Sequence, residues 1–196
     1  MNAMSSQKGN TYLIVDLEAT CTDAGEFPRH EMEIIEIGAV AVEGKALAQV
    51  GEFEAFVRPV RNPLLTEFCT RLTSITQAEV EAADPFPVVN DRFRAWVGGF
   101  ASPVFCSWGN YDRNQFLQDC AHHRVPYPFP TDYHINIKAR FAKRQGIGKS
   151  VGMKKALQLA GLPLEGTHHR GIDDARNMVR LMPYIFGQAR LGRQKS

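Results

Sequence analysis

The chain has 196 residues, of which 44% are hydrophobic and 22% charged, and its formal net charge is +2. These values are typical of one soluble globular domain, and they exclude a transmembrane protein because no apolar run is long enough to span a bilayer. The polar residues 1–9 lack the apolar core of a signal peptide, so we expect a disordered tail there and a cytoplasmic protein without membrane association.

The first predicted element is a strand over residues 11–18, which ends in two carboxylates, Asp16 and Glu18. Alternation along a strand places both on one face, whereas Val15 and Leu17 point to the other. Neighbouring acids repel unless a cation lies between them, and Mg²⁺ or Mn²⁺ prefers such oxygen ligands. The alternative is a strand end that emerges into solvent, which so short a motif favours when taken alone.

Two further strands, over residues 32–44 and 53–59, are separated by a short connection and should form an antiparallel hairpin beside the first strand. Asn62 followed by proline predicts the start of a helix that runs to about Leu72. Thr76 and Glu79 have the spacing of a capping box and predict a second helix.

The remaining elements alternate between helix and strand. We expect a helix over 84–100, a strand over 103–108, a helix from about Asp112 that buries Phe116, Leu117 and Cys120, a strand and helix within 133–146, a helix capped by Ser150 that closes at Gly161, and a helix over 172–186. This order indicates an α/β domain.

Two patterns in the second half of the chain need separate interpretation. The stretch Gly148-Lys149-Ser150 is not a P-loop, because the required upstream glycine is replaced by Lys143. The surrounding run 140–155 holds six Lys or Arg residues and no acid. It is either a solvated face or the path of a phosphate backbone, and the small net charge does not decide between them.

The four cysteines, Cys21, Cys69, Cys106 and Cys120, have no C-x-x-C spacing and sit mostly in apolar contexts. This usage favours reduced core thiols over zinc ligands or disulfides.

A third acid, Asp112, follows a strand and a turn and opens a helix, so it should lie at the carboxyl edge of the sheet, where sites of α/β proteins collect. Its alternative role is that of a helix N-cap.

Near the C-terminus, the spacing H-x-x-x-x-D occurs twice, as His168 with Asp173 and as His169 with Asp174. Helical periodicity places Asp174 on the apolar face with Met178, and Asp173 on the opposite face. A carboxylate on an apolar face needs a partner. Asp174 is therefore the fourth candidate metal ligand, and His169 is the histidine that can reach it.

Four acids and one histidine form a set that suits metal-assisted phosphodiester hydrolysis, in which one metal activates water and the other stabilises the leaving oxygen. The histidine can accept the proton of that water near neutral pH.

The motifs DLEAT (16–20), Asp112 after SWGNY, and HRGIDDA (169–175) resemble the three motifs of the DEDDh 3′→5′ exonucleases, and IIEIGAV (34–40) is similar to their Eri-1-like subgroup, which includes the histone-mRNA 3′ exonuclease. The resemblance spans residues 10–187, followed by a basic tail over 188–196. It implies a ribonuclease H-like fold, with a mixed five-stranded sheet and helices on both faces.

Carried over by position, the resemblance implies that Asp16, Glu18, Asp112 and Asp174 hold two Mg²⁺, replaceable by Mn²⁺, with His169 and Glu18 in catalytic roles. It also implies that Ala19 and Thr20 hold the terminal sugar and that Leu72 and Ile75 contact the base, with Trp108 or Tyr111 stacking on it. No segment resembles the SAP module of some relatives, so the substrate stays open.

We therefore expect a metal-dependent exonuclease that acts on the 3′ ends of single-stranded RNA, or of DNA or short 3′ overhangs, and releases nucleoside 5′-monophosphates. The alternative is a catalytically silent nucleic-acid-binding module of the same fold. Nothing in the sequence indicates an oligomeric state.

Overall fold

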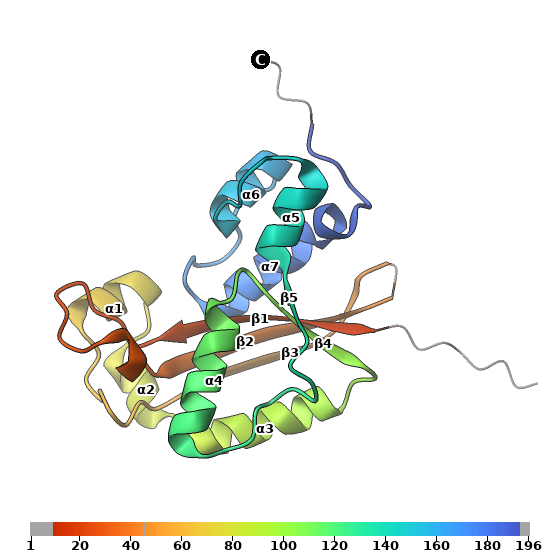
Figure 1. Cartoon of the computed structure of the whole chain (residues 1–196). Helices are drawn as coiled ribbons and strands as arrows, with labels where there is room; N and C mark the ends of the chain where they lie inside the picture. Colours follow the sequence, from red (N-terminus) through yellow and green to blue (C-terminus); the bar gives the residue numbers. More distant parts are fainter. Residues whose placement is uncertain (1–9, 45, 193–196) are drawn as a thin grey trace, which may run out of the picture.

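A mixed five-stranded sheet lies between two layers of helices in the computed structural model, which describes residues 10–44 and 46–192 (Figure 1). The expected tail over 1–9 and the last four residues of the expected basic tail lie outside the described residues. The α/β class, the five strands and the helices on both faces are confirmed.

The strands are β1 (Thr11–Ala19), β2 (Ile34–Glu43), β3 (Ala48–Phe56), β4 (Pro103–Ser107) and β5 (His134–Asn136). The helices are α1 (Glu67–Thr73), α2 (Gln77–Ala82), α3 (Phe86–Gly98), α4 (Tyr111–His123), α5 (Ile137–Gln145), α6 (Met153–Ala160) and α7 (Gly171–Phe186), with a short 3-10 turn at Arg29–Glu31.

The strand order is β3-β2-β1-β4-β5. Strand β1 is antiparallel to β2 and parallel to β4, so the expected hairpin and its position beside the first strand are both confirmed. Strand β3 begins earlier than expected, at Ala48 rather than near residue 53, because Ala48 already pairs with Glu43 across the turn. Backbone pairing, not the apolar run, decides where this edge strand starts.

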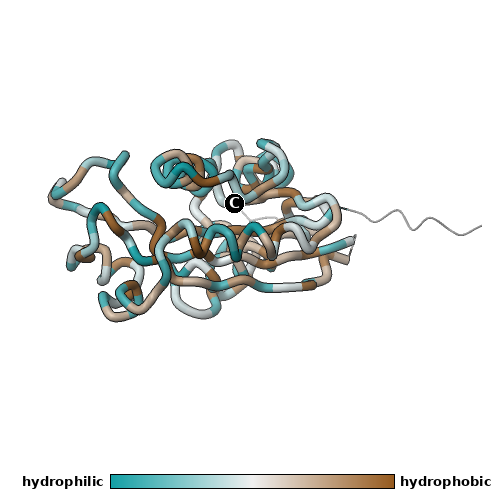
Figure 2. The backbone as a smooth tube through the Cα atoms, turned by 90° about the horizontal axis from the view of Figure 1, so that it is seen from below, coloured by the Kyte–Doolittle hydropathy of each residue, from teal (hydrophilic) through white to brown (hydrophobic). Residues whose placement is uncertain are grey.

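Alternating side chains of the central strands fill two cores. Ile14 packs with the helices α5, α6 and α7 on one face, whereas Val15 and Leu17 pack with α3 and α4 on the other. Figure 1 shows these layers above and below the sheet, with α1 and α2 beyond the arrowhead of β1. Figure 2 shows hydrophobic segments running through the middle of the molecule and hydrophilic ones in outer loops. The odd and even residues of β1 therefore face different layers.

The helix ends show which of the caps predicted from the local sequence are present. The capping box of Thr76 and Glu79 is confirmed by both of its hydrogen bonds. The expected cap at Asn62 is wrong: its backbone N–H donates to the carboxylate of Glu33, 2.9 Å away, and α1 is capped by Thr66 instead. Ser150 is also not a cap, since α6 begins after Gly152. Gly161 ends α6 in a left-handed conformation, as expected.

In the part of the chain that the structure describes, none of the helices is both long and apolar enough to cross a membrane. All four cysteines are free. Cys69, Cys106 and Cys120 are buried and Cys21 is half-buried, which agrees with their assignment as thiols.

Candidate active site

The carboxyl end of β1 carries the first pair of candidate ligands. Asp16 and Glu18 lie on the same face of the strand as Ile14, which is the face covered by α7. Glu18 is only 8% exposed, although a glutamate with an ordinary pKa is charged at pH 7. A buried carboxylate at this position needs a hydrogen-bond donor or a cation as its partner. The elements packed against β1 determine which partner is available.

Two glycines bring the start of α7 against the sheet. A Cβ atom on Gly38 of β2 would lie 2.1 Å from the backbone carbon of Gly171, so no other residue fits there without movement. The carboxylate of Glu36, also on β2, accepts the N–H of Gly171 at 2.9 Å and pairs with Arg170 at 3.2 Å. These contacts fix the first turn of α7 beside β1, and Asp174 lies in that turn. Sequence reasoning missed both Gly38 and Glu36 as residues that position the site.

Acids from β1, near the start of the chain, and from α7, near its end, line one cavity. One oxygen each of Asp16, Glu18 and Asp174 lie within 4.8 Å of one another. Asp112, in the first turn of α4, lines the same cavity of about 420 Å³, and its Oδ1 accepts the N–H of Leu17 at 3.0 Å. The structure therefore brings together all four acids that the sequence singled out. Asp173 faces away, where its carboxylate accepts the N–H of Thr167 and pairs with Arg176.

Burial raises the pKa values of all four acids, and repulsion by neighbouring carboxylates adds to this shift for Asp16 and Glu18. Burial raises the pKa of Glu18 to about 9, and the charges of Asp174 and Glu36 add to the effect. The pKa of Asp16 is raised by burial and by Asp112 and Glu18, and that of Asp174 by burial. Burial raises the pKa of Asp112 to about 6, although the N–H of Leu17 opposes this shift. The cluster thus lacks positive charge.

A divalent cation would supply the missing charge. The available donors are carboxylate oxygens, which are the preferred ligands of Mg²⁺ and Mn²⁺, and they project into one recess from β1, α4 and α7. The donor set therefore fits hard divalent metal ions.

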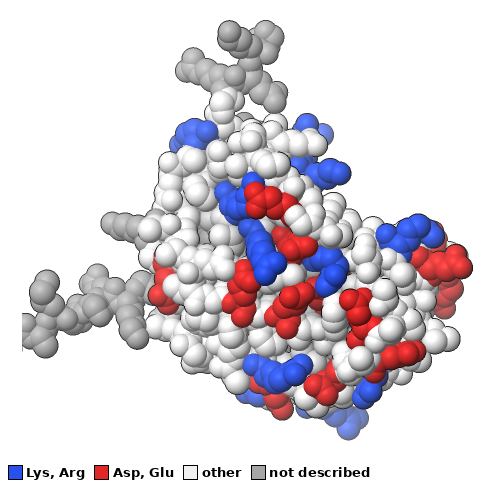
Figure 3. Space-filling view, turned by 180° about the vertical axis from the view of Figure 1, so that it is seen from behind, with Lys and Arg blue, Asp and Glu red and all other residues white. Residues whose placement is uncertain are grey.

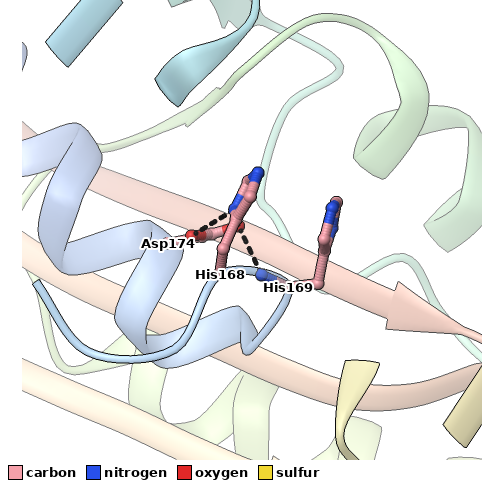
Figure 4. A group of neighbouring side chains, drawn as sticks. All are labelled: His168, His169 and Asp174. Carbon is pink, nitrogen blue, oxygen red and sulfur yellow. Dashed lines mark hydrogen bonds and ion pairs between the residues drawn. The ribbon is translucent and has the colours of Figure 1, made fainter. Parts of the chain in front are cut away.

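The two histidines before α7 lie side by side (Figure 4). Their rings stack with centroids 4.0 Å apart. The ring of His168, not that of His169, contacts Asp174: its Nδ1 lies 3.0 Å from Oδ2. His169 donates its backbone N–H to the same carboxylate, and its Nδ1 lies 3.8 Å from Oε1 of Glu18. Sequence reasoning placed His169 at the site and missed the contact of His168, although the doubled H-x-x-x-x-D spacing was a signal.

His169 lies at the rim of the cavity. Its side chain is 41% exposed and lines the cavity beside Asp16 and Glu18. Burial, followed by the neighbouring His168, lowers its pKa below 6.5. Both effects favour the neutral form of the ring.

The residues expected to contact the substrate divide into those that line the cavity and those that do not. Ala19 and Leu72 line the cavity, as do Trp108 and Tyr111. Thr20 and Ile75 are not among its lining residues. The hydroxyl of Thr20 accepts the N–H of Glu33, and Ile75 is buried against Cys69. Met32 and Cys21 are lining residues that sequence reasoning did not identify.

Comparison with known proteins agrees with this arrangement. The RNase T exonuclease family model matches residues 13–182. The human protein named 3'-5' exoribonuclease 1 is 32% identical over 175 residues, which cover 86% of this chain and 50% of that protein. Human ERI1 exoribonuclease 2 is 29% identical, over 90% of this chain and 28% of that protein. The chain thus spans between about a quarter and a half of these curated relatives.

Among solved structures, the nuclease domain of 3'hExo, described as a DEDDh family member bound to rAMP, superposes with a TM-score of 0.81 at 27% identity and covers 97% of this chain and 99% of that one. A 3'-exonuclease described as recognising the histone mRNA stem-loop superposes with a TM-score of 0.80, also at 27% identity, over 96% of this chain and 67% of that one. The resemblance seen in the sequence is confirmed: the chain belongs to the RNase T exonuclease family, in its DEDDh branch.

Proposed function

We propose that this protein is a metal-dependent 3′→5′ exonuclease that removes nucleoside 5′-monophosphates from the 3′ end of single-stranded RNA. The observation that carries the proposal is the cavity in which Asp16, Glu18, Asp112 and Asp174 face one another with His169 at the rim. The names of the relatives support an RNA substrate. A cytoplasmic location stays a prediction.

Each residue has a distinct task in this proposal. Asp16, Glu18, Asp112 and Asp174 would hold two Mg²⁺ ions, which when bound activate a water and stabilise the leaving oxygen. The ring of His169 would accept the proton of the attacking water, and its lowered pKa favours the unprotonated form that this role requires. Oε1 of Glu18 lies 3.8 Å from Nδ1 of that ring, so the proposed proton acceptor lies beside the acid cluster.

The opening of the cavity suits an unpaired end of a strand. Leu72 is 36% and Tyr111 47% exposed at its edge, and Trp108 lies with them in the lining. The indole N–H of Trp108 donates to the carbonyl of Val151, which fixes the ring. Apolar and aromatic faces stack on any base, so we expect little sequence preference.

The direct test is degradation of a 5′-labelled single-stranded RNA in the presence of Mg²⁺. We expect stepwise shortening from the 3′ end, release of nucleoside 5′-monophosphates, and no cutting of a circular RNA. Asp174→Asn should be inactive, whereas the neighbouring Asp173→Asn, a matched control on the outer face of α7, should retain activity. Internal cutting of the circle, or equal activity of both variants, would contradict the proposal.

A DNA oligonucleotide of the same sequence tests whether the protein prefers RNA to DNA. The 2′-OH is the group that distinguishes RNA from DNA at one site. We expect faster degradation of the RNA, and equal rates on both substrates would widen the proposal to single-stranded nucleic acids in general.

A further inference from the structure

A second cavity, distant in sequence from the candidate ligands, is lined almost entirely by cations. It has a volume of about 730 Å³ and lies between α5 and the segment after α7; we call it the α5 cavity. Its lining residues are Ala139, Arg140, Lys143, Arg144 and Arg190. The residues 140, 143 and 144 lie on one face of α5, because positions three and four apart are neighbours on a helix.

The structure holds these cations together by specific bonds. The side chain of Gln145 donates to the carbonyls of Tyr184 and Ala189 and accepts the N–H of Leu191. Arg190, between the last two, donates to the backbone carbonyl of Arg144. One arginine is thus fixed beside another although their charges repel.

Arginines in and just before α7 differ from these, because they pair with acids. Arg170, which precedes α7, pairs with Glu36, and within α7 Arg176 pairs with Glu52 at 2.6 Å and Arg180 with Glu165 at 3.0 Å. Figure 3 shows that acidic and basic side chains interleave on that face of the molecule.

Within the described residues, no acid lines the α5 cavity and none of its four cations forms an ion pair. Unpaired like charges around one hollow attract an anion.

The cations continue toward the candidate catalytic cavity. Gly152 and Met153, at the start of α6, line the catalytic cavity. The next two residues, Lys154 and Lys155, are exposed. Helices α5 and α6 both pack against α7 and contribute to the same core. Exposed cations therefore follow directly after Met153, which lines the catalytic cavity, and others lie on α5 in the same layer of helices.

We propose that the α5 cavity binds backbone phosphates of a single-stranded nucleic acid, upstream of the 3′ end that occupies the catalytic cavity. This inference rests on the proposed function for the position of the 3′ end. It assigns the basic run 140–155 to phosphate contact, together with Arg190, which lies outside that run. Phosphate contacts carry no sequence information, so the site would tether any strand long enough to reach it.

The test is the salt dependence of binding, measured by fluorescence anisotropy in EDTA with a single strand long enough to span both cavities. For Lys143→Ala/Arg144→Ala, we expect the slope of log Kd against log salt to fall by about 1.4, since each lost contact removes about 0.7 for single strands. The matched control is Arg92→Ala/Arg94→Ala, on exposed positions of α3 across the sheet. An unchanged slope, or an equal change in the control, would overturn the proposal.

Hydrolysis of a dinucleotide, which is too short to reach α5, separates this inference from the proposed function. The Lys143→Ala/Arg144→Ala variant should cleave it at the wild-type rate while its KM for the long strand rises. Loss of dinucleotide cleavage in the variant would contradict the α5 site. A wild type that binds the long strand but cleaves neither substrate would refute the proposed function, and the salt slopes would still decide the α5 site.

Discussion

Helix α4 carries two buried aspartates, two turns apart, in opposite circumstances. Asp119 is 1% exposed; its Oδ2 accepts the N–H of Ile34 at 2.9 Å and its Oδ1 pairs with Arg61 at 3.2 Å. Asp112 is 4% exposed, accepts the N–H of Leu17, and shares its cavity with Asp16 and other acids. Burial raises the pKa of each to about 6. The pKa values thus do not distinguish them; their partners do.

The acids near Asp119 and those near Asp112 differ in the same way. Glu33, next to the Asp119 network, accepts the N–H groups of Val60, Arg61 and Asn62. These acids are satisfied by donors from the protein and hold loops together. Acids that face one another instead need a cation from outside. From this difference we propose that the Asp119 network is structural and the Asp112 cluster functional.

The largest expected effect is on activity at the Asp112 cluster. Asp16→Asn keeps the shape of the side chain but removes a charge that would bind metal, so activity should fall by about 10³-fold or more, equivalent to about 4 kcal/mol. Without metal, the variant should unfold at the same temperature as the wild type or higher, because repulsion is relieved. Assays of cleavage and thermal unfolding check both. A variant that loses stability together with activity would place Asp16 among the structural acids.

The reverse result is expected at Asp119. Asp119→Ala leaves Arg61 and the N–H of Ile34 without this partner, and breaking a buried pair destabilises by about 3–5 kcal/mol. Below the unfolding temperature, cleavage per folded molecule should change little. Chemical denaturation and single-turnover assays measure the two quantities. Unchanged stability would remove the basis of the contrast.

Substitution of His168 tests whether a residue that contacts a proposed metal ligand changes the metal affinity of the cluster. Its ring contacts Asp174, and the loss of such outer contacts weakens metal binding by about 10–100-fold. His168→Phe keeps a ring to stack on His169 but removes the hydrogen bond. We expect a higher metal concentration at half-maximal activity with nearly the same maximal rate. An unshifted metal dependence would show that the contact is incidental.

The last prediction concerns the pH dependence of stability. Without metal, folded Glu18 has a pKa raised from 4.5 to about 9, so the folded state binds a proton that the unfolded chain releases. Its contribution therefore makes the protein less stable as pH rises from about 4.5 to about 9. Thermal unfolding of the metal-free protein between these pH values should show a smaller decline for Glu18→Gln than for the wild type. An equal decline of thermal stability in both proteins would argue against the raised pKa of Glu18.

Local sequence patterns predicted the candidate ligands but not the residues that position them. Asp174 could be assigned because helical periodicity separates it from Asp173, and the capping box at Thr76 because both partners lie within one turn. Gly38 and Gly171 could not be paired, since their close approach depends on how α7 docks on β2. The cap expected at Asn62 failed for the same reason: a distant carboxylate, Glu33, binds that backbone.

Calorimetric titration of Mn²⁺ into the metal-free protein tests most directly whether the facing acids form the metal site. We predict two bound ions for the wild type and for Asp119→Asn, measured below its unfolding temperature, and loss of binding in Asp16→Asn. Binding that survives Asp16→Asn and disappears in Asp119→Asn, or no binding to the wild type, would contradict the account.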